Sequence, residues 1–173
     1  MTNFKEDLQR VKAFAFDVDG VLSSPKVYVH PDGDLIRTMN TKDGYAIQYA
    51  VKRGYPIAII TGGKSESVGM RFKNLGLTDI YLGSAHKVSD FEDFISKYGF
   101  NADEVLYMGD DLPDFHVMQK AGVACSPSDA VEEIKAISDY ISHLSGGEGC
   151  VRDVIEQVLR LHGRWMDGEA FVW

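Results

Sequence analysis

The sequence predicts an α/β fold in which a parallel sheet lies between two layers of helices. Two observations favour it: short apolar runs recur along the 173-residue chain, and amphipathic segments separate them. Apolar runs without polar alternation are typical of strands buried on both faces, and parallel strands need helical crossovers. The composition, 45% hydrophobic and 25% charged, is that of a globular domain with a core. We therefore expect one domain over residues 1–173.

The apolar runs and the segments between them give the expected elements in chain order. Glycines follow four of the amphipathic segments, where a helix C-terminal cap favours glycine; they are Gly54, Gly76, Gly99 and Gly122. The expected strands are Ala13–Asp17, Ile57–Thr61, Asp79–Leu82, Val105–Gly109, Val123–Cys125 and Tyr140–Ser142. The expected helices are Gly44–Arg53, Ser65–Leu75, Lys87–Tyr98, Pro113–Ala121, Ala130–Ala136 and Cys150–Leu161.

Two segments depart from this alternation. Residues 26–39, KVYVHPDGDLIRTM, alternate apolar and polar side chains around a Pro-Asp-Gly-Asp turn, which predicts a β-hairpin directly after the first strand. Residues 150–173 comprise the last helix and a tail, GRWMDGEAFVW, rich in apolar and aromatic residues. We expect about the last ten residues to be mobile, as chain ends often are, and to gate a neighbouring site or to be disordered.

Charge and hydropathy exclude several classes of partner. The formal net charge of −8 argues against nucleic acid and against anionic membrane surfaces. No stretch approaches the roughly 20 apolar residues that span a bilayer. The first residues, MTNFKEDLQRVK, lack the apolar core of a signal peptide, and the two cysteines have no metal-ligand spacing. We therefore expect a cytoplasmic protein.

Residues able to do chemistry follow four of the expected strands, and parallel strands bring their carboxyl ends to one edge of the sheet. Carboxylates follow the first and fourth strands, a threonine and glycines follow the second, and a lysine opens the helix after the third. Several carboxylates at one place need a cation, and Mg²⁺ suits them, while hydroxyl, amide and ammonium groups bind phosphate. Together they indicate phosphoryl transfer through an aspartyl-phosphate. The residues are Asp17, Asp19, Thr61, Gly62, Gly63, Lys87, Asp110, Asp111 and Asp114.

The segments DVDGV, TGG, a lone lysine and GDDLPD, in this order, resemble the four motifs of the haloacid dehalogenase (HAD) superfamily. The resemblance implies a HAD-like, Rossmann-like fold. It also implies that Asp17 is the nucleophile and that Asp19 is the general acid and base. Thr61, Gly62 and Lys87 would then bind the transferred phosphoryl group.

The same resemblance implies a magnesium site. The Asp17 carboxylate, the Asp19 backbone carbonyl and Asp110 would hold the ion, with Asp111 in support. The residue types agree with this, because a carboxylate nucleophile can approach phosphorus only if a cation offsets the repulsion. A second carboxylate can protonate the leaving alkoxide and then deprotonate the attacking water.

Further likenesses narrow the family. No insertion is long enough for a cap domain, and the hairpin stands in its place. With KDGYAI, RFKNLGL and GGEGCVRDVIEQVL, the chain resembles the cap-less 3-deoxy-D-manno-octulosonate (KDO) 8-phosphate phosphatases. That family implies a homotetramer whose hairpins build a central barrel. It makes Arg71 a candidate substrate contact across a subunit interface, and it makes Asp43 and Gly44 a candidate mobile loop near the substrate.

Other functions stay open at this point. A phosphatase for nine-carbon sugar acids, KDN 9-phosphate or N-acylneuraminate 9-phosphate, is the nearest alternative, but that branch tends to carry an acidic residue where Gly63 stands. A phosphotransferase would need a cap to exclude water. A non-catalytic HAD-like domain, the partner of a nucleotidyltransferase for example, would not need all four motifs.

Overall fold

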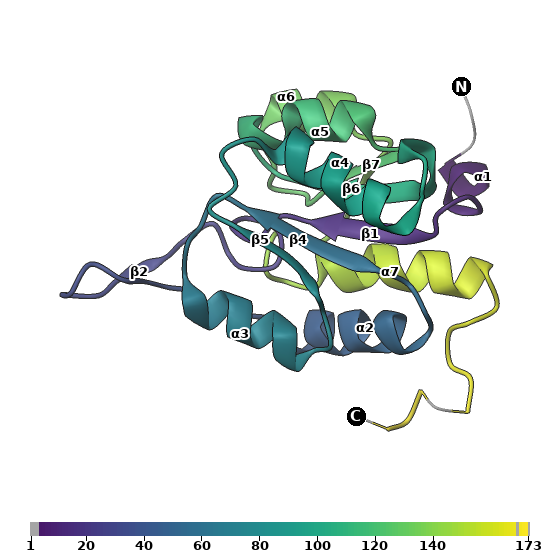
Figure 1. Ribbon diagram of the computed structural model, residues 1–173, viewed down its shortest axis with the longest axis horizontal. Coiled ribbons are helices and arrows are strands. Elements are labelled where there is room, and N and C mark those ends of the chain that lie inside the picture. Colours follow the sequence, from purple (N-terminus) through teal and green to yellow (C-terminus); the bar gives the residue numbers. More distant parts are fainter. Residues whose placement is uncertain (1–3, 169, 173) are drawn as a thin grey trace.

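The computed structural model, which describes residues 4–168 and 170–172, confirms the predicted α/β fold. Six strands form one parallel sheet in the order β5-β4-β1-β6-β7-β8 (Figure 1). The central strand β1 pairs with β4 on one side and with β6 on the other. The strands are β1 (Ala13–Phe16), β4 (Ile57–Thr61), β5 (Asp79–Leu82), β6 (Val105–Met108), β7 (Val123–Ser126) and β8 (Tyr140–Ile141).

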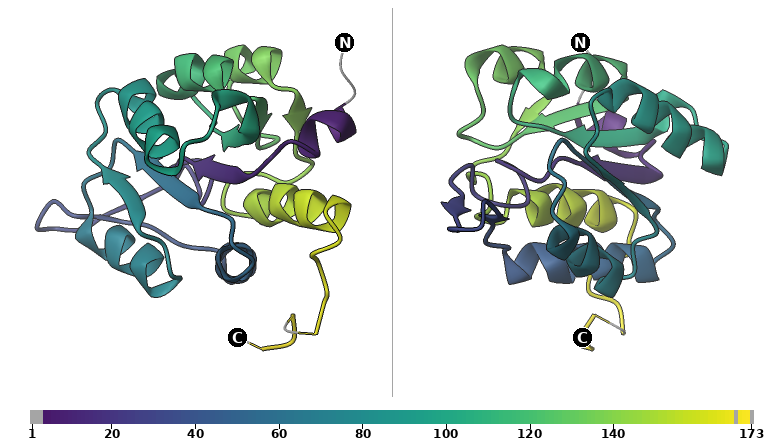
Figure 2. Two further views of the ribbon diagram at one scale, coloured as in Figure 1. Left: turned by 45° about the vertical axis from the view of Figure 1, so that its right-hand side comes forward. Right: turned by 60° about the vertical axis from the view of Figure 1, so that its left-hand side comes forward.

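Helices cover both faces of the sheet, as Figures 1 and 2 show. One face carries α2 (Thr41–Lys52), α3 (Glu66–Asn74) and α7 (Cys150–Leu161), and the other carries α4 (Lys87–Tyr98), α5 (Phe115–Lys120) and α6 (Glu132–Ile137). Alternate side chains of a strand point to opposite faces. Phe14 and Phe16 of β1 therefore pack under α2 and α7, whereas Ala13 and Ala15 pack under α4 and α5.

The predicted hairpin is present and projects from the body of the molecule (Figure 1). Strand β2 (Tyr28–Val29) pairs antiparallel with β3 (Leu35–Ile36), and all four side chains are exposed. The two-stranded sheet is separate from the main sheet. Its apolar side chains and strand edges are thus uncovered within one chain.

Several predicted boundaries shift, each for a local reason. Helix α2 begins at Thr41 rather than at residue 44, because the Asn40 side chain accepts a hydrogen bond from the Lys42 N–H and caps the helix. The helix predicted over 113–121 divides into a 3₁₀ turn, η2 (Leu112–Asp114), and α5. A short helix, α1 (Phe4–Leu8), and a second 3₁₀ turn, η1 (Ala102–Glu104), escaped prediction.

The role predicted for Gly122 as a helix cap is wrong. Its φ is not positive, and its need for glycine is steric, since a Cβ there would lie 2.2 Å from the Asp103 carbonyl oxygen. The other three glycines do adopt positive φ, as a left-handed cap requires.

The described part of the C-terminal tail packs along α2 and α7, and Trp173 lies outside the described residues. The Tyr49 hydroxyl lies within hydrogen-bond distance of two acceptors in the tail, the Arg164 carbonyl at 3.1 Å and the Asp167 carboxylate at 2.9 Å. The Trp165 ring meets the Tyr49 ring edge-on, and the Ala170 carbonyl accepts a hydrogen bond from Tyr45. The tail thus has partners within its own chain. Among the described residues, no helix is both long and apolar enough to cross a membrane.

Candidate active site

The carboxyl end of β1 delivers Asp17, which is 7% exposed. Its N–H continues the ladder to β6 by donating to the Met108 carbonyl at 3.1 Å, so the backbone here is as rigid as the strand. One carboxylate oxygen, Oδ1, accepts the Val18 N–H at 2.6 Å, and Oδ2 lies 2.8 Å from the Lys87 Nζ. The sheet and an ion pair therefore both fix this carboxylate.

Two further carboxylates come from the segment after β6. Carboxylate oxygens of Asp17, Asp110 and Asp114 lie within 4.8 Å of one another. Asp114 is fully buried and holds its neighbours in place. Its Oδ1 accepts from the Lys87 Nζ and the Tyr107 hydroxyl, both at 2.7 Å, and its Oδ2 accepts from the Asp110 N–H at 3.3 Å. Sequence reasoning gave Asp114 no specific role, because its contacts depend on how β6 and α4 meet.

Gly20 makes room for this cluster. Its φ is +81°, which disfavours any residue with a side chain, and a Cβ there would lie 1.9 Å from the Asp110 Oδ2. The glycine in DVDGV is therefore needed for more than a turn. It lets the loop after β1 pass directly against the Asp110 carboxylate.

Burial and neighbouring charge raise the pKa values of Asp17 and Asp110. Burial and the charge of Asp114 raise the pKa of Asp17 to about 7, although Lys87 partly opposes the shift. Burial and the charges of Asp17 and Asp114 raise the pKa of Asp110 to about 8. Burial alone would lower the pKa of Lys87, but the two carboxylates beside it outweigh burial and raise that pKa. One lysine thus does not neutralise the cluster.

These observations fit a divalent cation. Carboxylate oxygens are the ligands of Mg²⁺, and an ion among them would relieve the repulsion that raises the two pKa values. Asp17 and Asp110 have the carboxylate oxygens best disposed to hold it, since those of Asp114 already accept hydrogen bonds from three donors.

The carboxyl ends of the neighbouring strands complete a cleft of about 520 Å³. Thr61, 2% exposed, ends β4, and its Oγ1 accepts the Gly63 N–H at 3.2 Å. The Thr61 carbonyl accepts the Ser84 N–H at 2.9 Å, which ties this turn to the segment after β5. The residues that line the cleft are Asp17, Asp19, Pro25, Thr61, Gly62, Gly63, Ser84, Ala85, Lys87, Asp110, Asp111, Pro113 and Asp114.

Asp19 faces the same cleft and has a partner that sequence reasoning missed. Arg37, which follows β3 in the hairpin, pairs with both oxygens of the Asp19 carboxylate. The only sequence signal was a basic residue in the hairpin, and basic residues in hairpins are usually solvated.

The structure shows the surroundings of three further predicted site residues. Asp111 lines the cleft, but it is exposed, and its carboxylate accepts the Leu112 N–H at 2.7 Å and caps η2. Asp43 does not lie in a mobile loop, so that prediction is wrong. It is buried in the first turn of α2 and accepts the Arg152 N–H at 2.7 Å, and burial raises its pKa to about 6. Arg71 lies over Gly44 on α2, and neither Arg71 nor Asp43 lines the cleft.

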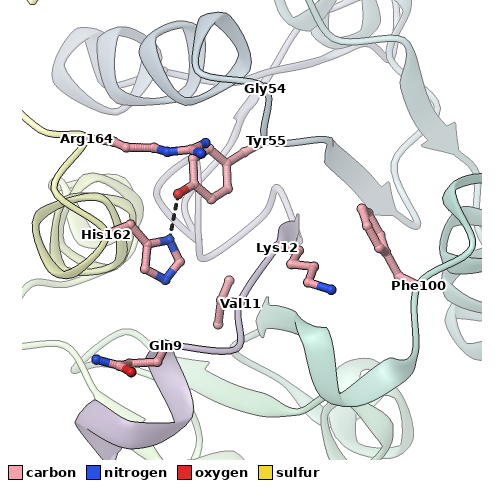
Figure 3. A pocket seen from close by; sticks show the side chains of 8 residues that line it. All are labelled: Gln9, Val11, Lys12, Gly54, Tyr55, Phe100, His162 and Arg164. Carbon is pink, nitrogen blue, oxygen red and sulfur yellow. Dashed lines mark hydrogen bonds between the residues drawn. The ribbon is translucent and has the colours of Figure 1, made fainter.

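A second cavity, of about 570 Å³, lies at the amino ends of β1 and β4 (Figure 3). There the Tyr55 hydroxyl and the His162 Nδ1 form a 2.6 Å hydrogen bond, and Arg164 lies across the Tyr55 ring. Lys12 pairs with Glu104 at 2.5 Å. The described residues that line this cavity include no carboxylate, so they do not offer the metal ligands that the carboxyl-end cleft offers.

Comparisons with known proteins agree with this geometry. A family model described as haloacid dehalogenase-like hydrolase matches residues 76–152. The KDO 8-phosphate phosphatase of Salmonella typhi is 34% identical over 163 residues, which are 94% of this chain and 87% of that protein. The chain belongs to the KDO 8-phosphate phosphatase family of HAD-like hydrolases.

Solved structures of this family superpose closely. The KDO 8-phosphate phosphatase of Yersinia pestis matches with a TM-score of 0.90 and 28% identity, over 93% of this chain and 87% of that one. The enzyme of Moraxella catarrhalis, in complex with magnesium, phosphate and KDO, matches with a TM-score of 0.87 and 34% identity, over 91% of both chains. The family's fold is therefore present over nearly the whole chain.

Proposed function

We propose that this protein is a magnesium-dependent phosphatase that hydrolyses KDO 8-phosphate to KDO and phosphate. One observation carries the proposal: three carboxylates within 4.8 Å of one another share a cleft with a buried lysine and a threonine–glycine turn. The relatives named for this activity, one of them holding magnesium, phosphate and KDO, support the choice of substrate and ion.

The geometry supports the following roles. Asp17, fixed at the end of β1, attacks phosphorus and forms an aspartyl-phosphate. Asp19 protonates the leaving oxygen and later deprotonates the water that cleaves the intermediate. Lys87 and the Thr61–Gly62 turn bind the phosphoryl oxygens, and the fixed position of Lys87 between Asp17 and Asp114 orients it toward the nucleophile.

The Asp17 and Asp110 carboxylates and the Asp19 carbonyl would hold Mg²⁺, with Asp111 in support. When bound, the ion neutralises charge on the phosphoryl oxygens and on the carboxylate cluster. Asp114 keeps Lys87 and the Asp110 backbone in position for both tasks.

A panel of sugar phosphates, assayed for phosphate release with and without Mg²⁺, tests this function. We expect KDO 8-phosphate to give a kcat/KM at least about tenfold above those of KDN 9-phosphate and N-acylneuraminate 9-phosphate. A reversed order would identify a phosphatase of nine-carbon sugar acids. No phosphate release from any substrate in the presence of Mg²⁺ would contradict the proposal and favour a non-catalytic binding domain.

The proposal extends to assembly. We propose a single domain that forms a homotetramer through residues 26–39. Exposed apolar side chains on the hairpin support it, with Tyr28 69% and Val29 74% exposed. Arg71 would then reach a neighbour's substrate. Light scattering at about micromolar concentration should give four times the chain mass, and a monomer would contradict the assembly. A cytoplasmic location stays a prediction.

A further inference from the structure

Arg37 differs from the rest of the hairpin that carries it. The side chains of β2 and β3 are exposed, but the Arg37 side chain is only 6% exposed. Its Nε lies 2.5 Å from the Asp19 Oδ1, and its Nη2 lies 2.9 Å from the Asp19 Oδ2. Such a two-point pair fixes both the position and the rotation of a carboxylate, which a single contact does not.

The hairpin also fixes the guanidinium of this pair. The Arg37 Nη1 donates to the carbonyl of Leu35 at 2.9 Å, so the guanidinium is fixed to its own strand. On the Asp19 side, the Ser23 Oγ lies 3.3 Å from the Asp19 Oδ1, and its one proton also has the Val18 and Ser24 carbonyls as acceptors at 3.2 Å. Asp19, whose side chain is 40% exposed, therefore keeps a face toward the cleft while the hairpin holds its carboxylate.

Arg37 also lies against the phosphate-binding turn. A Cβ on Gly63 would come within 3.3 Å of the Arg37 Nη2 and within 3.5 Å of the Thr61 Oγ1. The guanidinium thus lies beside both the loop after β1 and the turn after β4. A solvated surface arginine has no such fixed position.

We propose that Arg37 is a positioning residue, which orients the Asp19 carboxyl group for proton transfer and so makes the hairpin part of the active site. This inference rests on the proposed phosphatase function. In the first step an Asp17 oxygen bonds to phosphorus, the bond from phosphorus to the substrate oxygen breaks, and that oxygen takes the electron pair and a proton from Asp19. In the second step a water oxygen bonds to phosphorus and gives a proton to Asp19. The bond from phosphorus to the Asp17 oxygen breaks, and its electron pair returns to the Asp17 carboxylate, which releases phosphate.

Asp19 serves both steps from one place, so its orientation affects each of them. The guanidinium holds both oxygens of the ionised carboxylate that accepts the proton from water. When one oxygen is protonated, the guanidinium keeps its contact with the other oxygen, and the Leu35 carbonyl keeps the guanidinium in place. A carboxyl group free to rotate would spend much of its time out of reach of the leaving oxygen, and misplacement of about 1 Å can cost about 100-fold in rate.

The first test compares Arg37→Met and Arg37→Lys, with Arg10→Met as the matched control. Arg10, which follows α1, also pairs with a carboxylate, that of Asp7 on α1, at 2.7 Å, but it lies outside the lining of the cleft. With KDO 8-phosphate and Mg²⁺, we expect Arg37→Met to lower kcat about 10- to 100-fold and to change KM less than about threefold. Arg37→Lys, which keeps one contact, should recover part of the rate, and Arg10→Met should match the wild type.

A leaving group that needs no proton provides an independent readout. Phosphoenzyme formation from 4-nitrophenyl phosphate should depend on Arg37 less than formation from KDO 8-phosphate does, because nitrophenolate leaves without protonation. Breakdown of the phosphoenzyme still needs Asp19, so Arg37→Met should accumulate it. A purely structural role would slow both substrates equally and would contradict the inference.

A double-mutant cycle with Asp19→Asn decides whether Arg37 acts through Asp19. Asp19→Asn should slow turnover about 10²- to 10⁴-fold, and adding Arg37→Met should then change kcat by less than about threefold. Independent, multiplicative losses would overturn the inference and indicate that Arg37 contacts the substrate directly. A wild-type kcat in Arg37→Met would also overturn the inference. If Arg37→Met does not fold, Arg37→Lys enters the same cycle. A wild-type protein that hydrolyses neither substrate would refute the proposed function, whatever the role of Arg37.

Discussion

Two cavities of similar volume, about 520 and 570 Å³, lie at opposite ends of one sheet and differ in their electrostatics. At the carboxyl ends of the strands, carboxylates crowd together, and the pKa values of Asp17 and Asp110 rise to about 7 and 8. At the amino ends, polar groups pair locally. Tyr55 bonds to His162 (Figure 3), and Lys12 pairs with Glu104. Concavity alone therefore does not identify the active site of this fold.

The physical reason for the difference lies in the direction of the strands. Side chains after a strand's carboxyl end belong to loops that begin at a rigid, buried position. In a parallel sheet all of these loops gather at one edge. The repulsion among the carboxylates at this edge favours a cation that offsets it, and among the described residues the lining of the amino-end cavity has no such cluster.

The largest expected difference between the two ends comes from matched carboxylates. Asp17→Asn should lower kcat on the order of 10⁴-fold or more, because an amide cannot form the acyl phosphate. Asp79, at the amino end of β5, is also buried and pairs with a lysine, Lys97, at 2.5 Å. Asp79→Asn should lower the free energy of unfolding by about 1–3 kcal/mol and leave kcat within about twofold. Phosphate release measures both activities. Equal losses in the two variants would contradict the proposed difference between the carboxyl and amino ends of the sheet.

A glycine pair tests the close packing of the carboxyl-end cleft. Gly20→Ala should lower activity about 100-fold or more, because its Cβ would displace the Asp110 carboxylate. Gly33, at the hairpin turn, has a similar φ of +92° and nothing within 4 Å of the added Cβ. Gly33→Ala should therefore cost only the backbone strain of about 1–2 kcal/mol and keep kcat. If both variants lost activity alike, strain and not the clash would be responsible.

Magnesium and pH should act together on stability. Because the folded pKa values of Asp17 and Asp110 lie above the ordinary 3.8, the folded chain keeps protons that the unfolded chain releases. Stability without metal should therefore fall as pH rises from about 4 to about 8. About 10 mM Mg²⁺ should offset this at about pH 8, raising Tm by about 5 °C or more, and should do little at about pH 5.

Asp110→Asn is the control for the magnesium effect. It should remove most of the Tm rise at about pH 8. The pH dependence from Asp43, whose pKa is about 6, should persist, because Asp43 lies away from the cluster. An equal magnesium effect at both pH values, by thermal denaturation, would show that the ion binds elsewhere.

The smallest expected effect concerns the amino-end cavity. Tyr55→Phe removes the hydrogen bond to His162 and should lower the free energy of unfolding by about 1 kcal/mol, with kcat and KM unchanged. Denaturant unfolding and steady-state kinetics measure the two quantities. A change in kcat would mean that this cavity communicates with the cleft through the sheet.

The sequence by itself determined which segments form the strands of the sheet, where each strand ends and which residues follow its carboxyl end. Asp17, Thr61 and Asp110 could be predicted at one edge of the sheet. The apolar runs and the helices that connect them are local signals in the sequence, and helical connections make the strands parallel. The family resemblance then supplied their roles. The hairpin at residues 26–39 could be predicted for the same reason, since its alternation and its turn are local signals.

Only the tertiary structure decided the contacts between distant segments. Arg37 meets Asp19 because the hairpin folds back on the loop after β1, and Asp114 meets Lys87 across 27 residues of chain. Asp43 is buried because α7 packs on α2 and its Arg152 N–H needs an acceptor. Composition and periodicity indicate which face of an element is apolar, but the partner of a polar side chain depends on how elements far apart in the chain pack together.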